Sequence, residues 1–185
     1  MSDRSDETVL VLGANSDVAK QSILLYVGMG YRVIAASRST AQIAEFFAQY
    51  PETSGRVEIR YFDAVDFSNH HTFYQTLSVK PTIVLYAAGF QIVNEEALVN
   101  WEGTYQMMKV HYCGAVSILN IIAMDRGNKN LRRIIGLSSL SGVRGRKSNF
   151  VYGSTKAAFT QYLAGLRQLL ASREIIVNVV VAGYI

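Results

Sequence analysis

The chain has 185 residues, of which 50% are hydrophobic and 17% charged, a profile typical of a folded globular protein and not of a disordered one. At this length we expect one domain whose hydrophobic core is stable without disulfides or a structural metal. The single cysteine, Cys113, excludes an internal disulfide. The net charge of +4 arises from 18 basic and 14 acidic residues. They form no aromatic-interleaved basic stripe, so we expect no nucleic-acid partner.

Residues 1–7 are polar and acidic, and they lack the basic start and apolar middle of a signal peptide. No stretch of 18 or more apolar residues predicts a membrane span. We therefore expect a cytoplasmic protein without a membrane-spanning segment.

Short apolar runs typical of buried strands alternate with helical patterns along the whole chain. Strands are predicted over 8–12, 31–36, 56–62, 82–86, 131–137 and 175–181. Helices are predicted over 18–27, 41–50, 68–77, 98–124 and 151–171, with Gly103 as a weak point in the fourth. This alternation predicts βαβ units and a parallel sheet covered by helices on both faces.

A loop containing one glycine follows the first predicted strand, where a doubly wound sheet receives the pyrophosphate of a dinucleotide. Of the usual three glycines only Gly13 is present, so a plain turn is the alternative interpretation. The position of the loop, after the first strand of an alternating α/β chain, favours cofactor binding. We predict contacts to a cofactor from Gly13, Asn15, Ser16, Asp17 and Val18.

The residues that follow the second and third strands bear on the choice of cofactor. Ser37 and Arg38 follow the second strand, with no carboxylate to bind the ribose 2′-OH of NAD. An arginine there suits the 2′-phosphate of NADP, so NADP(H) is favoured over NAD(H). Asp63, followed by Ala64, is either an acceptor for the adenine amine or a turn residue.

Two adjacent histidines, His70 and His71, fall on a polar helical pattern. We expect both to be exposed to solvent. We predict no metal site.

The stretch 152–156 holds the most specific chemical signal. Tyr152 and Lys156 are four residues apart on a predicted helix, so their side chains share one face. Ser139 lies thirteen residues before Tyr152, at the end of the fifth predicted strand. A phenol, a cation and a hydroxyl can together move a proton to or from a carbonyl oxygen.

These marks, in this order, resemble the short-chain dehydrogenase/reductase family of the classical single-domain type. The resemblance implies a Rossmann-type, three-layer α/β/α fold with strand order 3-2-1-4-5-6, and an NAD(P)-dependent enzyme that interconverts a carbonyl and a secondary alcohol. It implies that Tyr152 is the general acid/base, that Lys156 lowers the pKa of Tyr152 and binds the cofactor ribose, and that Ser139 binds the substrate oxygen. Further implied cofactor contacts are Ala87, Ala88, Gly89, Gly183 and Ile185, together with Tyr152 and Lys156 themselves.

Several positions depart from the family pattern. His111 stands where the family has an asparagine that holds a water of the proton relay, and we predict either a relay or a packing role for it. Tyr86 and Ala87 replace an asparagine pair, and Ala182 replaces a proline. His111, the acidic Asp17 at a usual glycine position and the missing substrate lid leave open a second hypothesis, a nucleotide-binding scaffold with impaired catalysis.

The chain stops at Ile185, where the resemblance implies a further strand and a substrate lid. We therefore expect a single truncated domain, 1–185, with an exposed apolar edge at the sixth strand. The resemblance also implies a homodimer or homotetramer. Apolar positions suited to such an interface are Tyr112, Val116, Leu163 and Leu166.

Overall fold

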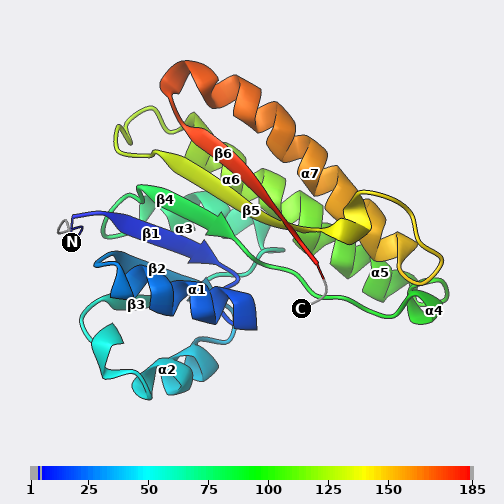
Figure 1. The fold of residues 1–185 in the computed structure, drawn as a ribbon, viewed down its shortest axis with the longest axis horizontal. Coiled ribbons are helices and arrows are strands. Elements are labelled where there is room, and N and C mark those ends of the chain that lie inside the picture. The colour runs from blue at the N-terminus through cyan, green and yellow to red at the C-terminus, as the bar shows by residue number, and fades with distance from the viewer. Residues whose placement is uncertain (1–3, 5, 184–185) are drawn as a thin grey trace.

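The computed structural model describes residue 4 and residues 6–183, which build one six-stranded parallel sheet in the order β3-β2-β1-β4-β5-β6 (Figure 1). The strands are β1 (Thr8–Leu12), β2 (Arg32–Ser37), β3 (Val57–Tyr61), β4 (Ile83–Tyr86), β5 (Arg133–Ser139) and β6 (Ile176–Ala182). The helices are α1 (Asp17–Gly28), α2 (Thr40–Ala48), α3 (His70–Gln75), α4 (Asn94–Ala97), α5 (Trp101–Met108), α6 (Ala115–Met124) and α7 (Phe150–Leu170). The predicted doubly wound α/β fold is confirmed, and each strand lies within two residues of its predicted bounds.

Short helical segments join these elements. They are the 3-10 turns η1 (Pro51–Thr53), η2 (Phe67–Asn69), η4 (Leu140–Gly142) and η5 (Ala171–Arg173), and the π-helical segment η3 (Lys109–Gly114). The fourth predicted helix, 98–124, is thus three consecutive segments, α5, η3 and α6. Gly103 is not its weak point, because the Asn100 side chain accepts a hydrogen bond from the Gly103 N–H at 2.9 Å and caps α5. The irregularity lies instead at η3.

Helices cover both faces of the sheet, as a parallel sheet requires. One buried cluster joins the strands to α1 and α2, and a larger one joins them to α3, α6 and α7. In Figure 1, α1 lies in front of the strands and α6 behind them. Because all strands are parallel, their carboxyl ends lie along one border of the sheet, called here the carboxyl edge. The loops after β1, β2, β4 and β5 lie together at this border.

One helical stretch, Trp101–Met124, is long and apolar enough to cross a membrane by length and composition. Half of its most apolar window is buried inside the domain, and Ile118, Leu119 and Ile122 have no exposed surface. The core helix of a folded domain has this composition, so the stretch is weak evidence for a membrane span.

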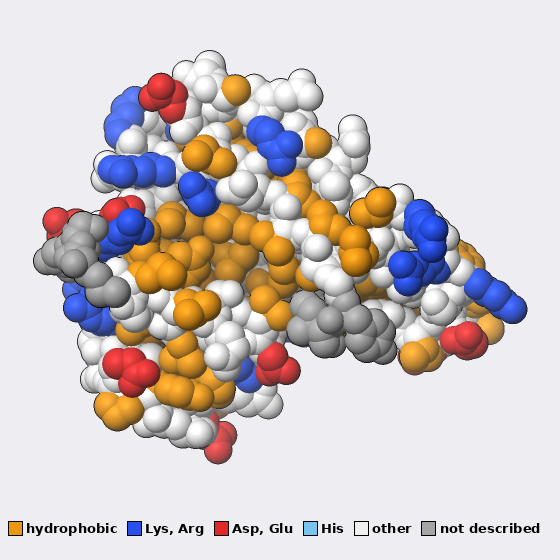
Figure 2. Space-filling model, viewed as in Figure 1, with side chains coloured by type: hydrophobic (Ala, Val, Ile, Leu, Met, Phe, Trp, Pro, Cys, Tyr) orange, Lys and Arg blue, Asp and Glu red, His pale blue; other side chains and the backbone are white. Residues whose placement is uncertain are grey.

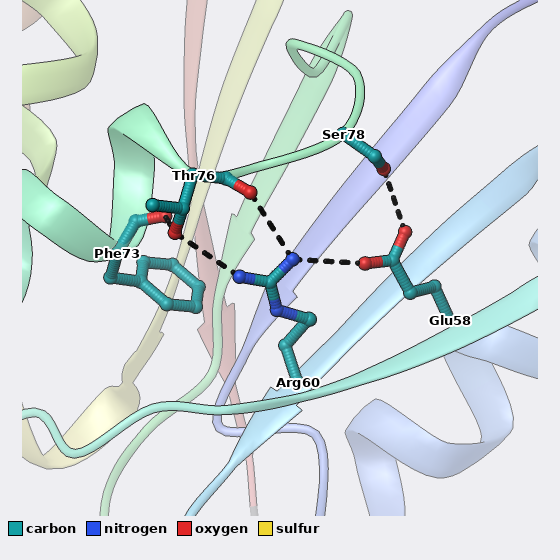
Figure 3. Close-up of polar contacts among 5 residues, drawn as sticks. All are labelled: Glu58, Arg60, Phe73, Thr76 and Ser78. Atoms are coloured by element: carbon teal, nitrogen blue, oxygen red, sulfur yellow. Dashed lines mark hydrogen bonds and ion pairs between the residues drawn. The ribbon is translucent and has the colours of Figure 1, made fainter.

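At one edge of the sheet a polar network fastens the end of α3 to β3 (Figure 3). Arg60 on β3 donates to the Thr76 carbonyl and hydroxyl, at 3.3 and 3.2 Å, and pairs with Glu58 at 3.1 Å. The Ser78 hydroxyl donates to the other oxygen of Glu58 at 2.8 Å. Charged side chains on this edge strand also disfavour pairing with a further strand.

Figure 2 shows hydrophobic side chains gathered over the central strands, on the face of the sheet toward the viewer. On the edge strand β6, Ile176 and Val180 are 50% and 44% exposed, as the predicted apolar edge requires. The predicted interface residues Leu163 and Leu166, in contrast, are buried under 5% exposure in the core between α7 and the sheet, so that part of the prediction was wrong.

Helix α7 packs closely on β5 because β5 carries a glycine at the contact. A Cβ built on Gly136 would lie 2.2 Å from Leu163 Cδ1 and 2.7 Å from Phe159 Cζ. Both side chains are fully buried, so neither can swing into solvent. This contact determines the distance between α7 and β5, the strand that ends at Ser139.

We predict that Gly136→Ala lowers the free energy of unfolding by about 1–3 kcal/mol, since it overpacks this contact. The matched control is Gly165→Ala on α7, where an added Cβ meets nothing within 4 Å. That change should stabilise the helix by about 0.5–1 kcal/mol. Urea unfolding of both variants checks the pair, and equal stabilities would contradict the close approach of α7 to β5.

Candidate active site

The loop between β1 and α1 is held in a form that only glycine adopts without strain. Gly13 has φ +88°, and a Cβ on it would lie 2.3 Å from the Ala88 backbone nitrogen. Ser16 then caps α1, accepting from the Ala19 N–H at 3.2 Å. The first turn of α1 therefore presents its free N–H groups toward the carboxyl edge of the sheet, where an anion is stabilised.

Two adjoining hollows occupy this edge and share Ser16, Ala87, Gly89 and Phe90. The first, of ≈ 280 Å³, is lined by Gly13, Asn15, Ser37, Arg38, Asp63, Ala64 and Ala88, with Phe62 and Val110 as apolar walls. The second, of ≈ 640 Å³, is lined by Asp17, Val18, Ser139, Tyr152, Lys156 and Gly183. Every described residue that the sequence predicted for the cofactor lines one of the two hollows, whereas Ile185 lies outside the described residues.

The first hollow has polar groups that suit a nicotinamide dinucleotide. Asn15 donates to Gln42 at 2.9 Å, but its Oδ1 is buried without a partner. Arg38 is exposed at the end of β2 and has no ion pair or hydrogen bond within residues 4 and 6–183. The Asn15 acceptor, the Arg38 guanidinium and the Gly13 turn fit a nicotinamide dinucleotide.

Asp63 already has a structural role. Its Oδ1 accepts from the Val65 N–H at 3.0 Å, which is the turn interpretation, while the carboxylate still lines the first hollow. The Asp63 carbonyl accepts from His70 Nε2 at 3.0 Å, and His70 Nδ1 accepts from the Ser117 hydroxyl at 2.9 Å.

The prediction that His70 is exposed was wrong: it is 1% exposed and stacks on Phe62, while His71 is exposed. Burial lowers the pKa of His70. A buried histidine anchor for the Asp63 backbone leaves no periodic signal in the sequence.

Two glycines bring Ser139 to Tyr152. A Cβ on Gly153 would lie 2.4 Å from the Ser141 carbonyl oxygen, and one on Gly142 would lie 2.8 Å from the Ala157 nitrogen. The turn η4 therefore lies directly against the first turns of α7. Neither glycine has a local sequence pattern that marks it as a packing residue.

The Ser139 hydroxyl is oriented by its own turn. Its oxygen accepts from the Ser141 N–H at 3.2 Å, so its hydrogen is free to be donated. Burial raises the pKa of Tyr152, and the hydrogen bond with Ser139 lowers it in part. The expectation that Lys156 governs this pKa is not met in the structure, where the Lys156 Nζ lies 5.8 Å from the phenol ring centroid.

Lys156 is a buried ammonium, 6% exposed. Its Nζ donates to the Leu137 carbonyl at 3.1 Å, and burial lowers its pKa to about 8. A Cβ on Gly89 would lie 3.1 Å from His111 Nε2 and 3.4 Å from this Nζ, so the glycine leaves room chiefly for the imidazole beside the ammonium. The amine therefore remains charged near neutral pH, close to its point of deprotonation.

His111 is fully buried next to these groups, with its ring edge-on to that of Tyr152 at 5.4 Å between centroids. Its Nε2 accepts from the Phe90 N–H at 3.0 Å, and its Nδ1 lies 2.7 Å from the Thr155 hydroxyl. Both ring nitrogens are thus engaged inside the protein.

Comparison with known proteins identifies the family of this chain. The family model of the short chain dehydrogenases matches residues 7–185. A probable NADP-dependent dehydrogenase of Haemophilus influenzae is 28% identical over 186 residues, covering 95% of this chain and 70% of the relative. An uncharacterized oxidoreductase of Mycobacterium tuberculosis is 27% identical over 177 residues, covering 92% of this chain and 70% of the relative.

Solved structures share the fold. Serine dehydrogenase from Escherichia coli superposes with a TM-score of 0.86 at 23% identity, covering 95% of this chain and 82% of that one. ElxO with NADP bound superposes with a TM-score of 0.87 at 18% identity, covering 96% of this chain and 73% of that one. The chain belongs to the short chain dehydrogenase family, and it is a nicotinamide-dependent oxidoreductase.

Proposed function

We propose that this protein reduces a carbonyl to a secondary alcohol, or catalyses the reverse reaction, with Tyr152 as the general acid/base and NADP(H) as the favoured cofactor. The observation that carries the proposal is the convergence of the Tyr152 phenol, the Ser139 hydroxyl and the buried Lys156 ammonium on one hollow. The hollow adjoins a second one whose polar lining suits a dinucleotide.

The cofactor, when bound, supplies or accepts the hydride at the substrate carbon. The residues that would hold it are the Gly13 turn, Asn15, Ser16 and Arg38 on the adenosine side, and Lys156 on the nicotinamide side. The relative named as NADP-dependent and the NADP-bound ElxO structure support the preference for NADP(H). Because Arg38 has no ion pair or hydrogen bond to the residues that the structure describes, its guanidinium is available for a 2′-phosphate.

Tyr152 has the protonation state that carbonyl reduction needs. Its pKa is raised by burial, so the phenol stays neutral at physiological pH and can donate its proton to the substrate oxygen. Ser139 donates a hydrogen bond to the same oxygen and stabilises the charge that develops there. The Lys156 ammonium is buried on the same side of the cleft, with its Nζ 5.8 Å from the phenol ring centroid, and would bind the nicotinamide ribose of the cofactor.

We predict that Tyr152→Phe lowers kcat for NADPH-dependent carbonyl reduction by about 10²–10⁴-fold, the usual contribution of a general acid. Binding of NADPH, followed by its fluorescence, should be retained because the ring remains. Tyr162→Phe on the same helix is the matched control, since its hydroxyl binds Asn120 away from both hollows. Unchanged turnover in Tyr152→Phe, or no wild-type turnover across a panel of aldehydes and ketones, would contradict the proposal.

We predict that Arg38→Ala weakens NADPH binding by about 10- to 100-fold, the loss of a charge-assisted contact, and leaves NADH binding nearly unchanged. Arg32→Ala, at the other end of β2, should alter neither affinity. Titration of each variant with both cofactors measures the ratio. If Arg38→Ala weakened both cofactors equally, Arg38 would not be the 2′-phosphate site.

A further inference from the structure

His111 joins two segments that line the cleft. Phe90, whose N–H donates to Nε2, belongs to the loop after β4 and lines both hollows. Thr155, the partner of Nδ1, immediately precedes Lys156 on α7. The Thr155 hydroxyl in turn donates to the Tyr152 carbonyl at 2.7 Å. One imidazole thus connects the cofactor loop with the backbone of the proposed proton donor.

The partners of His111 fix its tautomer. A backbone N–H can only donate, so Nε2 must be the unprotonated nitrogen. Since Thr155 gives its hydrogen to the Tyr152 carbonyl, its oxygen accepts from Nδ1–H. The hydrogen bonds therefore run in one direction, from Phe90 through His111 and Thr155 to Tyr152, and no ring nitrogen is left for a water.

The charge of the surroundings holds the ring neutral. Burial, and then the positive charge of Lys156, lower the pKa of His111 to about 3. Protonation would also place an Nε2–H against the Phe90 N–H. A ring in this state neither gains nor loses a proton during turnover near neutral pH.

The irregular helix around His111 determines the position of its imidazole ring. His111 lies in the π-helical segment η3, and π segments widen one turn of a helix. The buried Tyr86 hydroxyl donates to the carbonyl of Val110 at 2.6 Å, which fixes the turn from the sheet side. Gly114 closes the segment, where a Cβ would lie 2.2 Å from the Ala64 carbonyl oxygen.

We propose that His111 is a positioning residue. Its imidazole fixes the Phe90 loop and the first turns of α7 relative to each other, so that Tyr152 and Lys156 are correctly placed toward the substrate. The kinetic consequence of this proposal rests on the proposed carbonyl chemistry, but its geometry does not. Tyr86 supports His111 in this role, because the hydrogen bond from the Tyr86 hydroxyl to the Val110 carbonyl holds the π-helical turn that carries the imidazole.

The first test is His111→Phe, which keeps an aromatic ring but removes both nitrogens. We expect kcat to fall by about 10- to 100-fold, the effect of a small displacement of catalytic groups, with little change in the Kd of NADPH. The pH profile of kcat should keep its shape, since His111 does not titrate in the working range. His111→Gln, whose amide offers both a donor and an acceptor, should recover part of the loss.

Two further variants control this result. His71→Phe, an exposed histidine on α3, should leave kcat unchanged. Thr155→Val removes only the hydroxyl link and should lower kcat with the same pH profile, without adding to the loss in His111→Phe. Loss of one ionisation from the pH profile in His111→Phe would show a proton relay and overturn the proposal, as would unchanged kcat.

The geometry has a readout that needs no turnover. In the wild-type protein, ¹⁵N NMR of the imidazole should show a neutral ring protonated on Nδ1 from about pH 5 to 9. Hydrogen exchange of the Phe90 amide should accelerate in His111→Phe and not in His71→Phe. An imidazolium, the opposite tautomer or unchanged exchange of the Phe90 amide would overturn the proposal. If the NMR and exchange results are as expected but the wild-type protein shows no turnover, only the carbonyl chemistry is contradicted.

Discussion

The site depends on one buried charge, the Lys156 ammonium. A lysine that is 6% exposed needs a hydrogen-bond acceptor, and it finds one in the Leu137 carbonyl near the end of β5. This bond ties α7 to the strand that carries Ser139. Because the amine has lost most of its water, its charge acts strongly on the groups beside it in the cleft. This positive charge contributes to lowering the pKa of the buried His111, and the Tyr152 ring centroid, one turn earlier on the same helix, lies 5.8 Å from the Lys156 Nζ.

Glycines make that charge placement possible. Gly136 lets α7 lie close over β5, and Gly142 and Gly153 let the turn after β5 touch the first turns of α7. A Cβ on any of these three glycines would approach a neighbouring atom to less than 3.0 Å. The proposed catalytic side chains are therefore positioned by backbone approach as much as by their own bonds.

Much of this was predictable from the sequence. Alternating strand and helix patterns give the parallel sheet, and the strand ends then place Gly13, Arg38 and Ser139 at one edge. The spacing of Tyr152 and Lys156 places them on one helix face. These features depend on local periodicity and on the fixed geometry of parallel sheets, so they can be derived without coordinates.

Other features depend on contacts between distant segments and leave no local pattern. His70 and His71 look alike in sequence, yet only His70 is buried, because it bonds the Asp63 carbonyl and Ser117 across the fold. The π segment around His111 reads as ordinary helix, and Leu163 reads as a surface residue until its place over Gly136 is known.

The most direct test of the buried ammonium is its own titration, followed by NMR of labelled lysine side chains with Lys156→Arg to assign the signal. A midpoint at about pH 8, well below the 10.5 of a free lysine, is the result expected for the environment described here. A midpoint near 10.5 would mean that Lys156 is solvated, and that the arrangement of Ser139, Tyr152 and Lys156 around a dehydrated charge is incorrect.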